Sequence, residues 1–160
     1  MRVEWEAAGD YDEVGGCEAA QEALRLILTL VPREHLRRLT AIVVADRDPR
    51  GVALGIYQQD SVGTAAISLY LQPHLEQAQR VPKAAWGGAF RLELAHTLFH
   101  EVGHHVTRCL NRRAAPSRKS AQVHETLEKW AEQYAEKRLV RLAQVLAQEH
   151  AGTTRAPASS

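Results

Sequence analysis

The feature that most constrains the fold of this chain is the segment from 100 to 104, which reads His-Glu-Val-Gly-His within helical apolar spacing. Between residues 89 and 110 apolar side chains recur every three or four positions, and at about 100° per residue they form one helix stripe. The stripe consists of Leu92, Ala95, Phe99, Val102, Val106 and Leu110. His100 and His104 are four residues apart, so they stand one above the other beside this stripe. Gly103 has no side chain, which would let another element come close to the helix.

Two histidines placed in this way can bind one metal ion. Their ring nitrogens can both reach a zinc ion at about 2.0–2.1 Å. Glu101 lies about 100° further round the helix, so it is better placed to meet a water on the metal than to ligate. Zinc lowers the pKa of such a water to about 7, and a nearby carboxylate can then take its proton. The motif predicts a zinc-dependent hydrolase in which Glu101 is the general base.

A catalytic zinc site needs a third protein ligand, and the candidates lie further along the chain. Lys119 to Gln148 contains no proline or glycine and repeats apolar residues at helical spacing, which predicts a long amphipathic helix. Glu128 and Glu132 lie one turn apart beside its apolar stripe, so both can face the histidines if the two helices pack antiparallel. We expect Glu128 to be the third ligand and Glu132 to orient a ligating histidine.

The combination of His100-Glu101-Val102-Gly103-His104 with the later Glu128-x-x-Ala-Glu132 resembles the gluzincin pattern of zinc metallopeptidases. The short gap between the motifs is most similar to compact forms, the minigluzincins and the ImmA/IrrE-type metallopeptidases. The resemblance spans about residues 50 to 140. It implies a zincin-like domain in which His100, His104 and Glu128 bind zinc and Glu101 is the general base. The pattern usually has aspartate at the position of Glu132, which leaves Glu132 as an alternative ligand.

Other side chains compete for the metal. His96 lies four residues before His100, so a metal bridging these two would leave Glu101 without a catalytic task. Three successive helical turns do not converge readily on one tetrahedral ion, which disfavours this arrangement. His124 and Glu125 lie about one turn before the expected glutamate ligand and could replace it. A histidine as the third ligand would make the chain more similar to SprT-like proteases.

The remaining segments predict an α+β fold. Gly15 to Leu30 has a helical apolar stripe, and Gln79 to Gly88 is typical of a connecting loop. Three segments are expected to be strands, namely Thr40–Ala45, Val52–Tyr57 and Ala65–Leu71. We therefore expect one zincin-like domain over residues 1–150, with a small mixed sheet packed on the motif helix and the long helix. Residues 151–160 are expected to form a disordered tail.

The resemblance also suggests where a substrate would bind. In zincins an edge strand above the active-site helix pairs with the substrate peptide, and Ala65–Leu71 is the expected counterpart. The residues assigned to this role are Ala66, Ser68 and Tyr70. A plain structural strand is the alternative. A hydroxyl that stabilises a tetrahedral intermediate could come from Tyr57, Tyr70 or Tyr134.

Charge and composition narrow the class of partner. The formal net charge is +1 at 160 residues, which argues against a chain devoted to nucleic-acid binding. The segment between the two metal-bearing helices is basic, and Arg112 and Arg113 are its candidates for contact with an acidic partner or nucleic acid. A solvated loop is the simpler interpretation of these arginines. The resemblance to zinc metallopeptidases implies a protein or peptide substrate as the partner.

The chain start lacks the basic and apolar regions of a signal peptide, and no apolar run reaches the length of about 20 residues that spans a bilayer. Cys17 and Cys109 lack metal-site spacing and are expected to be free thiols, so we predict a cytoplasmic protein. The predicted activity is that of a zinc endopeptidase. The alternative is a zinc-containing regulatory or protein-interaction module of the same fold without useful peptidase activity.

Overall fold

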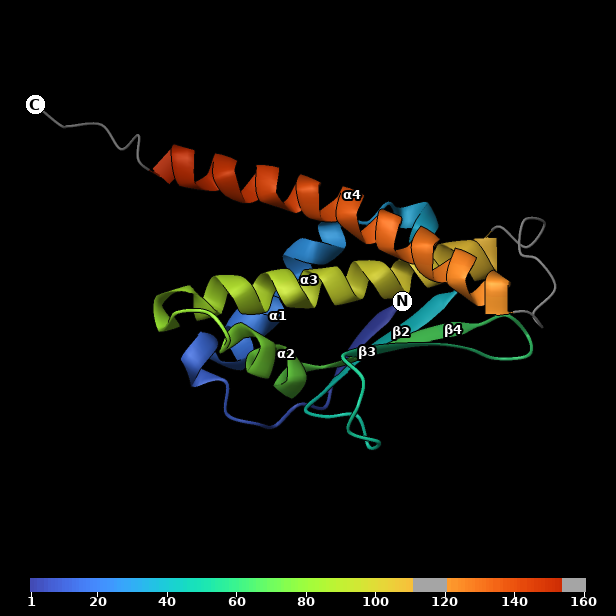
Figure 1. The fold of residues 1–160 in the computed structure, drawn as a ribbon, viewed down its shortest axis with the longest axis horizontal. Coiled ribbons are helices and arrows are strands. Elements are labelled where there is room, and N and C mark those ends of the chain that lie inside the picture. Colours follow the sequence, from blue (N-terminus) through green and yellow to red (C-terminus); the bar gives the residue numbers. More distant parts are fainter. Residues whose placement is uncertain (111–120, 154–160) are drawn as a thin grey trace, which may run out of the picture.

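The computed structural model describes residues 1–110 and 121–153, and it forms a four-stranded sheet with four α-helices (Figure 1). The strands are β1 (Arg2–Trp5), β2 (Leu39–Ala45), β3 (Gly55–Gln59) and β4 (Ala65–Tyr70). Their order across the sheet is β1-β2-β4-β3. The first three in this order run parallel, whereas β3 is antiparallel to β4. The expected α+β class with a small mixed sheet is confirmed.

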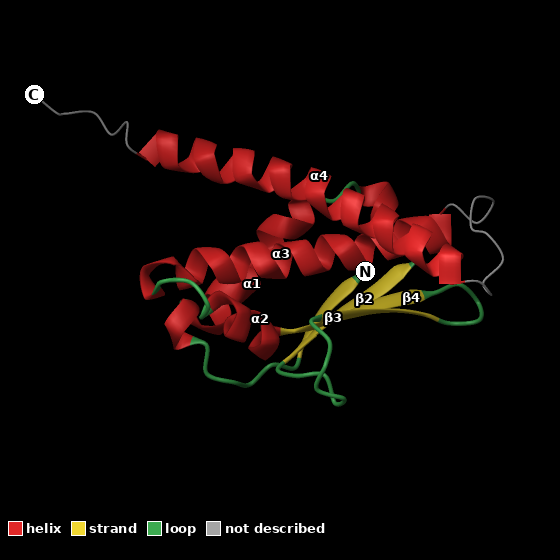
Figure 2. Cartoon of the chain, viewed as in Figure 1, coloured by secondary structure: helices red, strands yellow, loops and turns green. Residues whose placement is uncertain are grey.

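The helices are α1 (Gly16–Thr29), α2 (Leu71–Ala78), α3 (Trp86–His105) and α4 (Ala121–Thr153). Helices α3 and α4 lie above the sheet in the view of Figures 1 and 2, whereas α2 lies to its left. Short 3-10 turns occur at Asp12–Val14, Arg33–Leu36 and Lys83–Ala85, and a π-helical turn, η4, covers Val106–Leu110. Helix α3 lies between the sheet and α4, so the long helix packs on α3 and not directly on the sheet (Figure 1).

One face of the sheet forms the core with α1 and α3. Ile42 of β2 pairs with Ile67 of β4, and both are fully buried. Along β4 the residues Ile67 and Leu69 are fully buried, whereas Ala66 and Ser68 between them are half-buried. This alternation follows from the two-residue period of a strand, which sends neighbouring side chains to opposite faces. Ala66 and Ser68 therefore lie on the face away from the helical core.

The expectation that Ala65–Leu71 is an edge strand is wrong. β4, which carries Ala66, Ser68 and Tyr70, pairs with β2 on one side and β3 on the other. Its main-chain groups already serve two neighbours, so it offers no open edge for a peptide. Strand β3 is last in the strand order and pairs with β4 on one side. It is therefore the edge strand next to α3.

The motif helix α3 is confirmed, but its buried surface is broader than one stripe. Phe90, Leu94, Leu98 and Val102 are all buried, while Leu92, expected in the stripe, is 45% exposed. A helix covered on one side by the sheet and on another by α4 buries residues from two directions, which a single stripe does not describe.

The segment after β4 also differs from expectation. Leu71 to Ala78 forms helix α2, between the expected strand, which ended at Leu71, and the expected loop from Gln79, and no helix was expected there. Pro73 occupies the first turn of this helix, where the missing backbone N–H costs nothing because it would have no intrahelical partner.

Helix α4 confirms the long amphipathic helix and continues to Thr153, three residues into the segment expected to be a tail. The rest of that expected tail, residues 154–160, lies outside the described residues. Arg112 and Arg113, the candidates for contact with an acidic partner, also lie outside them. Within residues 1–110 and 121–153, the helices are too short or too polar to cross a membrane.

Candidate metal centre

The candidate site lies in the seam between α3 and α4. The two helices run antiparallel, so residues later on α3 meet residues earlier on α4 (Figure 1). They approach closely because Gly103 packs against Ala131. A Cβ atom at position 103 would lie only 2.7 Å from the Ala131 Cα atom. The glycine inside the motif thus has a packing reason, and it brings the α4 carboxylates within reach of the α3 histidines.

Three donor groups meet in this seam. The Nε2 atoms of His100 and His104 lie 3.1 Å apart. The Glu128 carboxylate spans both histidines, with Oε2 at 3.3 Å from His100 Nε2 and Oε1 at 3.4 Å from His104 Nε2. Among the described residues this is the one group of histidine, cysteine or acidic side chains whose donor atoms converge within 4.8 Å.

The spacing of these donors is close to that around a zinc ion. A tetrahedral zinc with bonds of about 2.0–2.1 Å has donor-to-donor edges of about 3.3–3.4 Å. The two imidazole nitrogens lie 3.1 Å apart, and the other two distances, 3.3 and 3.4 Å, are to different oxygens of the Glu128 carboxylate. Two imidazoles and one carboxylate are also a donor set that suits zinc and leaves a fourth position open. The residues present therefore fit the expected metal.

His104 is held in the form that binds metals. Its side chain is buried, and burial is the main cause that lowers the pKa of His104 to about 4, against the attraction of Glu128. The ring is therefore neutral near pH 7 and keeps a lone pair for a cation. Within the described part of the chain its buried Nδ1 atom has no hydrogen-bond partner.

Glu132 takes the orienting position that was expected of it. Its Oε2 accepts a hydrogen bond from His100 Nδ1 at 3.2 Å, which leaves the His100 Nε2 lone pair directed at Glu128 and His104. Its Oε1 accepts a second hydrogen bond from His96 Nε2 at 2.9 Å. These bonds lower the pKa of Glu132, the one from His96 most strongly, so the carboxylate stays ionised. The role of His96 in this contact was missed at the sequence level, where His96 was considered only as a rival ligand.

Glu101 lies on a different side of α3 from His100 and His104, against strand β3. Its side chain is buried, with 8% exposed, and burial raises its pKa even though the positive charge that His100 can carry lowers it. The backbone amide of Tyr57 on β3 bonds to this carboxylate and also favours the ionised form. A buried carboxyl group whose pKa is raised above its ordinary value can accept a proton more readily, which suits a general base.

Strand β3 passes directly against this carboxylate. A Cβ atom at Gly55 would lie 2.6 Å from Thr97 Cγ2 and 3.2 Å from Glu101 Cγ, so only glycine lets the strand approach α3 this closely. This contribution of Gly55 was also missed. A glycine inside a strand pattern often marks a close backbone approach, and that was the available signal.

The remaining candidates lie at the margin of the site or elsewhere. His124 is 71% exposed and lies 3.4 Å from Glu128, whereas Glu125 forms an exposed ion pair with Lys129. The structure thus places His124 beside the donor group without including it in that group.

The three tyrosine candidates for a stabilising hydroxyl are engaged differently. The Tyr134 hydroxyl bonds to His35 Nδ1 at 2.9 Å, and Tyr70 is buried with 7% exposed. Tyr57 lies on β3, its hydroxyl is 3.4 Å from His105 Nδ1, and its ring stacks under the Arg108 guanidinium at 5.8 Å. Of the three, Tyr57 is the one whose own backbone contacts Glu101.

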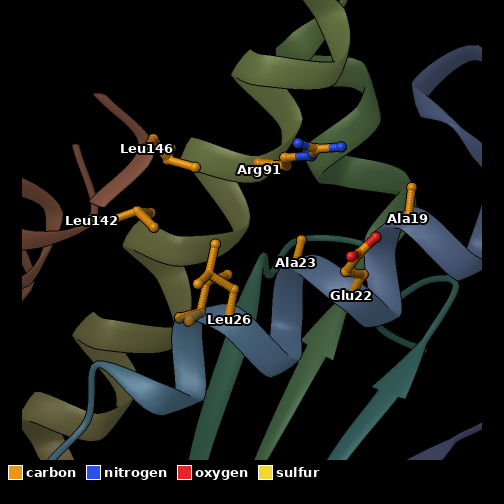
Figure 3. A pocket seen from close by; sticks show the side chains of 8 residues that line it. Ala19, Glu22, Ala23, Leu26, Arg91, Leu142 and Leu146 are labelled. Carbon is orange, nitrogen blue, oxygen red and sulfur yellow. The ribbon is translucent and has the colours of Figure 1, made fainter. Parts of the chain in front are cut away.

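A separate groove lies where α1, α3 and α4 meet, with a volume of about 220 Å³ (Figure 3). Its lining includes Leu26, Arg91, Leu142 and Leu146, and no residue of the candidate metal site takes part.

Comparison with known proteins found no matching protein-family model, no matching curated protein and no matching solved structure. The function of the chain is therefore inferred from the geometry of the seam.

Proposed function

We propose that this chain is a zinc-dependent endopeptidase with a zincin-like fold of the compact gluzincin type. One observation carries the proposal, namely that one donor atom from each of His100, His104 and Glu128 converges within 4.8 Å, a group that suits a zinc ion. The neighbouring Glu101 supplies the buried carboxylate that hydrolysis needs. Metal binding alone would not require that second carboxylate.

A zinc ion held by these residues would act as a Lewis acid that acidifies water and polarises a peptide carbonyl. Glu101 would accept the proton of the attacking water at its carboxylate. It would later return this proton to the leaving amide nitrogen. His104, neutral through burial, and His100, oriented by Glu132, would keep the ligand nitrogens in place throughout.

The substrate is proposed to be a protein or peptide in extended conformation. Strand β3 is an edge strand, and it lies against Glu101 through Gly55. A peptide that added to this edge would be held by main-chain hydrogen bonds close to the general base. This assignment replaces Ala66, Ser68 and Tyr70 of β4 as the substrate-binding strand.

The mechanism can be tested with Glu101→Gln, which removes the base but keeps the side-chain volume. We expect zinc content to stay at the wild-type level while cleavage of a proteome-derived peptide mixture, read as new termini by mass spectrometry, falls about 100-fold or more. Glu93→Gln on the same helix is the matched control and should cleave normally. Cleavage by Glu101→Gln at the wild-type rate would contradict the assigned role. Zinc binding without cleavage by any variant would favour the zinc-containing interaction module.

A further inference from the structure

One histidine next to the proposed metal site is used neither as a ligand nor as a base. His96 lies one turn before His100 on α3, and its Nε2 donates a hydrogen bond to Glu132 Oε1 at 2.9 Å. The other oxygen of the same carboxylate accepts the bond from His100 Nδ1 at 3.2 Å. We propose that His96 is a positioning residue for the metal centre, which fixes the Glu132 carboxylate so that it orients His100. This inference rests on the metal site proposed above.

His96 is not placed to bind the metal itself. Its ring centre lies 6.3 Å from that of His100, whereas the ring centres of His100 and His104 are 4.7 Å apart. The converging donor group in the described part of the chain includes His100, His104 and Glu128 but not His96. The Nε2 atom of His96 is already directed at Glu132. Its contribution to metal binding must therefore pass through that carboxylate.

The Glu132 carboxylate needs a second hydrogen-bond donor to stay in one orientation. Its side chain is 46% exposed, and a glutamate on a helix surface has three rotatable bonds that solvent leaves free. A carboxylate anchored at both oxygens keeps one orientation, and a single hydrogen bond would not restrict it as much.

The consequence for the metal centre is a fixed tautomer at His100. A carboxylate held at Nδ1 keeps the proton on that nitrogen and leaves the Nε2 lone pair for the cation. Loss of His96 would leave Glu132 with one partner and a wider range of orientations. The His100 ring would then be oriented less strictly, and the apparent affinity for zinc would fall.

The test measures the affinity of the full chain for Zn²⁺ by competition with a chromophoric chelator. Glu132→Ala should weaken zinc binding about 10-fold to 100-fold. His96→Ala should weaken it less, about 3-fold to 10-fold, because His100 keeps its partner. His96→Gln should restore affinity to within about twofold of wild type, since its amide can donate to the same oxygen. Adding His96→Ala to Glu132→Ala should have no further effect if His96 acts only through Glu132.

A control separates positioning from general damage to the fold. His35→Ala removes a histidine that bonds to Tyr134 outside the donor group and should leave zinc affinity unchanged. The visible absorption of the Co²⁺-loaded protein gives a second readout, and we expect it to change in His96→Ala and to be restored in His96→Gln. Two results would overturn the inference: wild-type affinity in His96→Ala, or an equal loss from His96→Ala in the Glu132→Ala background. If the wild type itself binds no zinc, the proposed function fails first, and that result is distinct from either.

Discussion

Two groups of histidines in this molecule face opposite sides of α3 and are satisfied in different ways. On the side of the sheet, His74 bonds to the Tyr70 carbonyl and the Thr97 hydroxyl, and both of its ring nitrogens are used. His105 lies against the Arg37 carbonyl in the same manner. In the seam with α4, the Nε2 atoms of His100 and His104 point at each other and at a carboxylate.

The difference shows what separates a structural histidine from a ligand. The buried histidines His74 and His105 receive oxygen partners from the fold, so nothing further is required. The seam brings two imidazole nitrogens and a carboxylate together, a donor group that could hold a metal ion. If the proposed site is correct, the neighbouring His104 and His105 have different roles, one as a ligand and one in the core.

The largest expected effects come from replacing His104 and His105 by alanine in two separate variants. His104→Ala should weaken Zn²⁺ binding at least about 100-fold, because it removes one of three ligands. His105→Ala should instead lower the free energy of unfolding by about 2–4 kcal/mol, because it leaves a cavity and an unpaired carbonyl at Arg37. Chelator competition measures the first effect, and urea unfolding of the metal-free protein measures the second.

Each of these two variants should be close to wild type in the property that the other one changes. His105→Ala, assayed below its melting temperature, should still bind zinc with nearly wild-type affinity. The metal-free stability of His104→Ala should stay close to that of wild type. Equal loss of metal affinity in both variants would break the distinction between ligand and structural histidines.

The next effect concerns acid pH and the buried His74. Burial lowers the pKa of His74 from an ordinary 6.5 to about 4. Between these two pKa values the unfolded chain is protonated at His74 and the folded chain is not. The contribution of His74 to the free energy of unfolding is therefore fully present above pH 6.5 and is lost as the pH falls towards 4. The loss reaches about 3 kcal/mol for this shift. Urea unfolding between pH 7 and pH 4.5 should show a shallower pH dependence in His74→Gln than in wild type, with chelator present in both. Identical slopes would contradict the assignment.

A smaller effect tests the close packing that creates the seam. Gly103→Ala would place a Cβ atom 2.7 Å from the Ala131 backbone, so α3 and α4 must move apart. We expect a loss of about 1–3 kcal/mol in stability, together with weaker zinc binding. Gly88→Ala on the same helix is the control, since a Cβ there meets nothing within 4 Å. It should be neutral or stabilising by up to about 1 kcal/mol. Thermal unfolding and zinc affinity of both variants would decide whether the seam depends on Gly103.

Local periodicity explains which parts could be predicted. The four-residue spacing of His100 and His104 sets their geometry once the segment is a helix, and the same holds for Glu128 and Glu132 on α4. The meeting of these pairs follows from antiparallel packing of two adjacent helices. A close approach of another element at Gly103 was also expected, and the structure shows that this element is α4 at Ala131.

Features that depend on long-range pairing could not be predicted in the same way. The assignment of β4 as the edge strand failed, because strand order is decided by which distant segments pair and not by alternation within one strand. Leu92 was misplaced because one stripe cannot describe a helix with two covered sides. The bond between His96 and Glu132 depends on the register at which α3 crosses α4, about which neither helix alone carries information.

The central claim is that His100, His104 and Glu128 form a zinc site, and the most direct test is zinc content by elemental analysis of purified protein. We predict about one zinc per chain in wild type and in Glu125→Ala, an exposed neighbour on the same helix. Glu128→Ala should lose the metal, while Glu132→Ala should retain it with lower affinity. The absence of zinc from wild type after refolding with the metal would contradict the account. Retention of full zinc by Glu128→Ala, with loss from Glu132→Ala, would contradict the ligand assignment and move it one turn along α4.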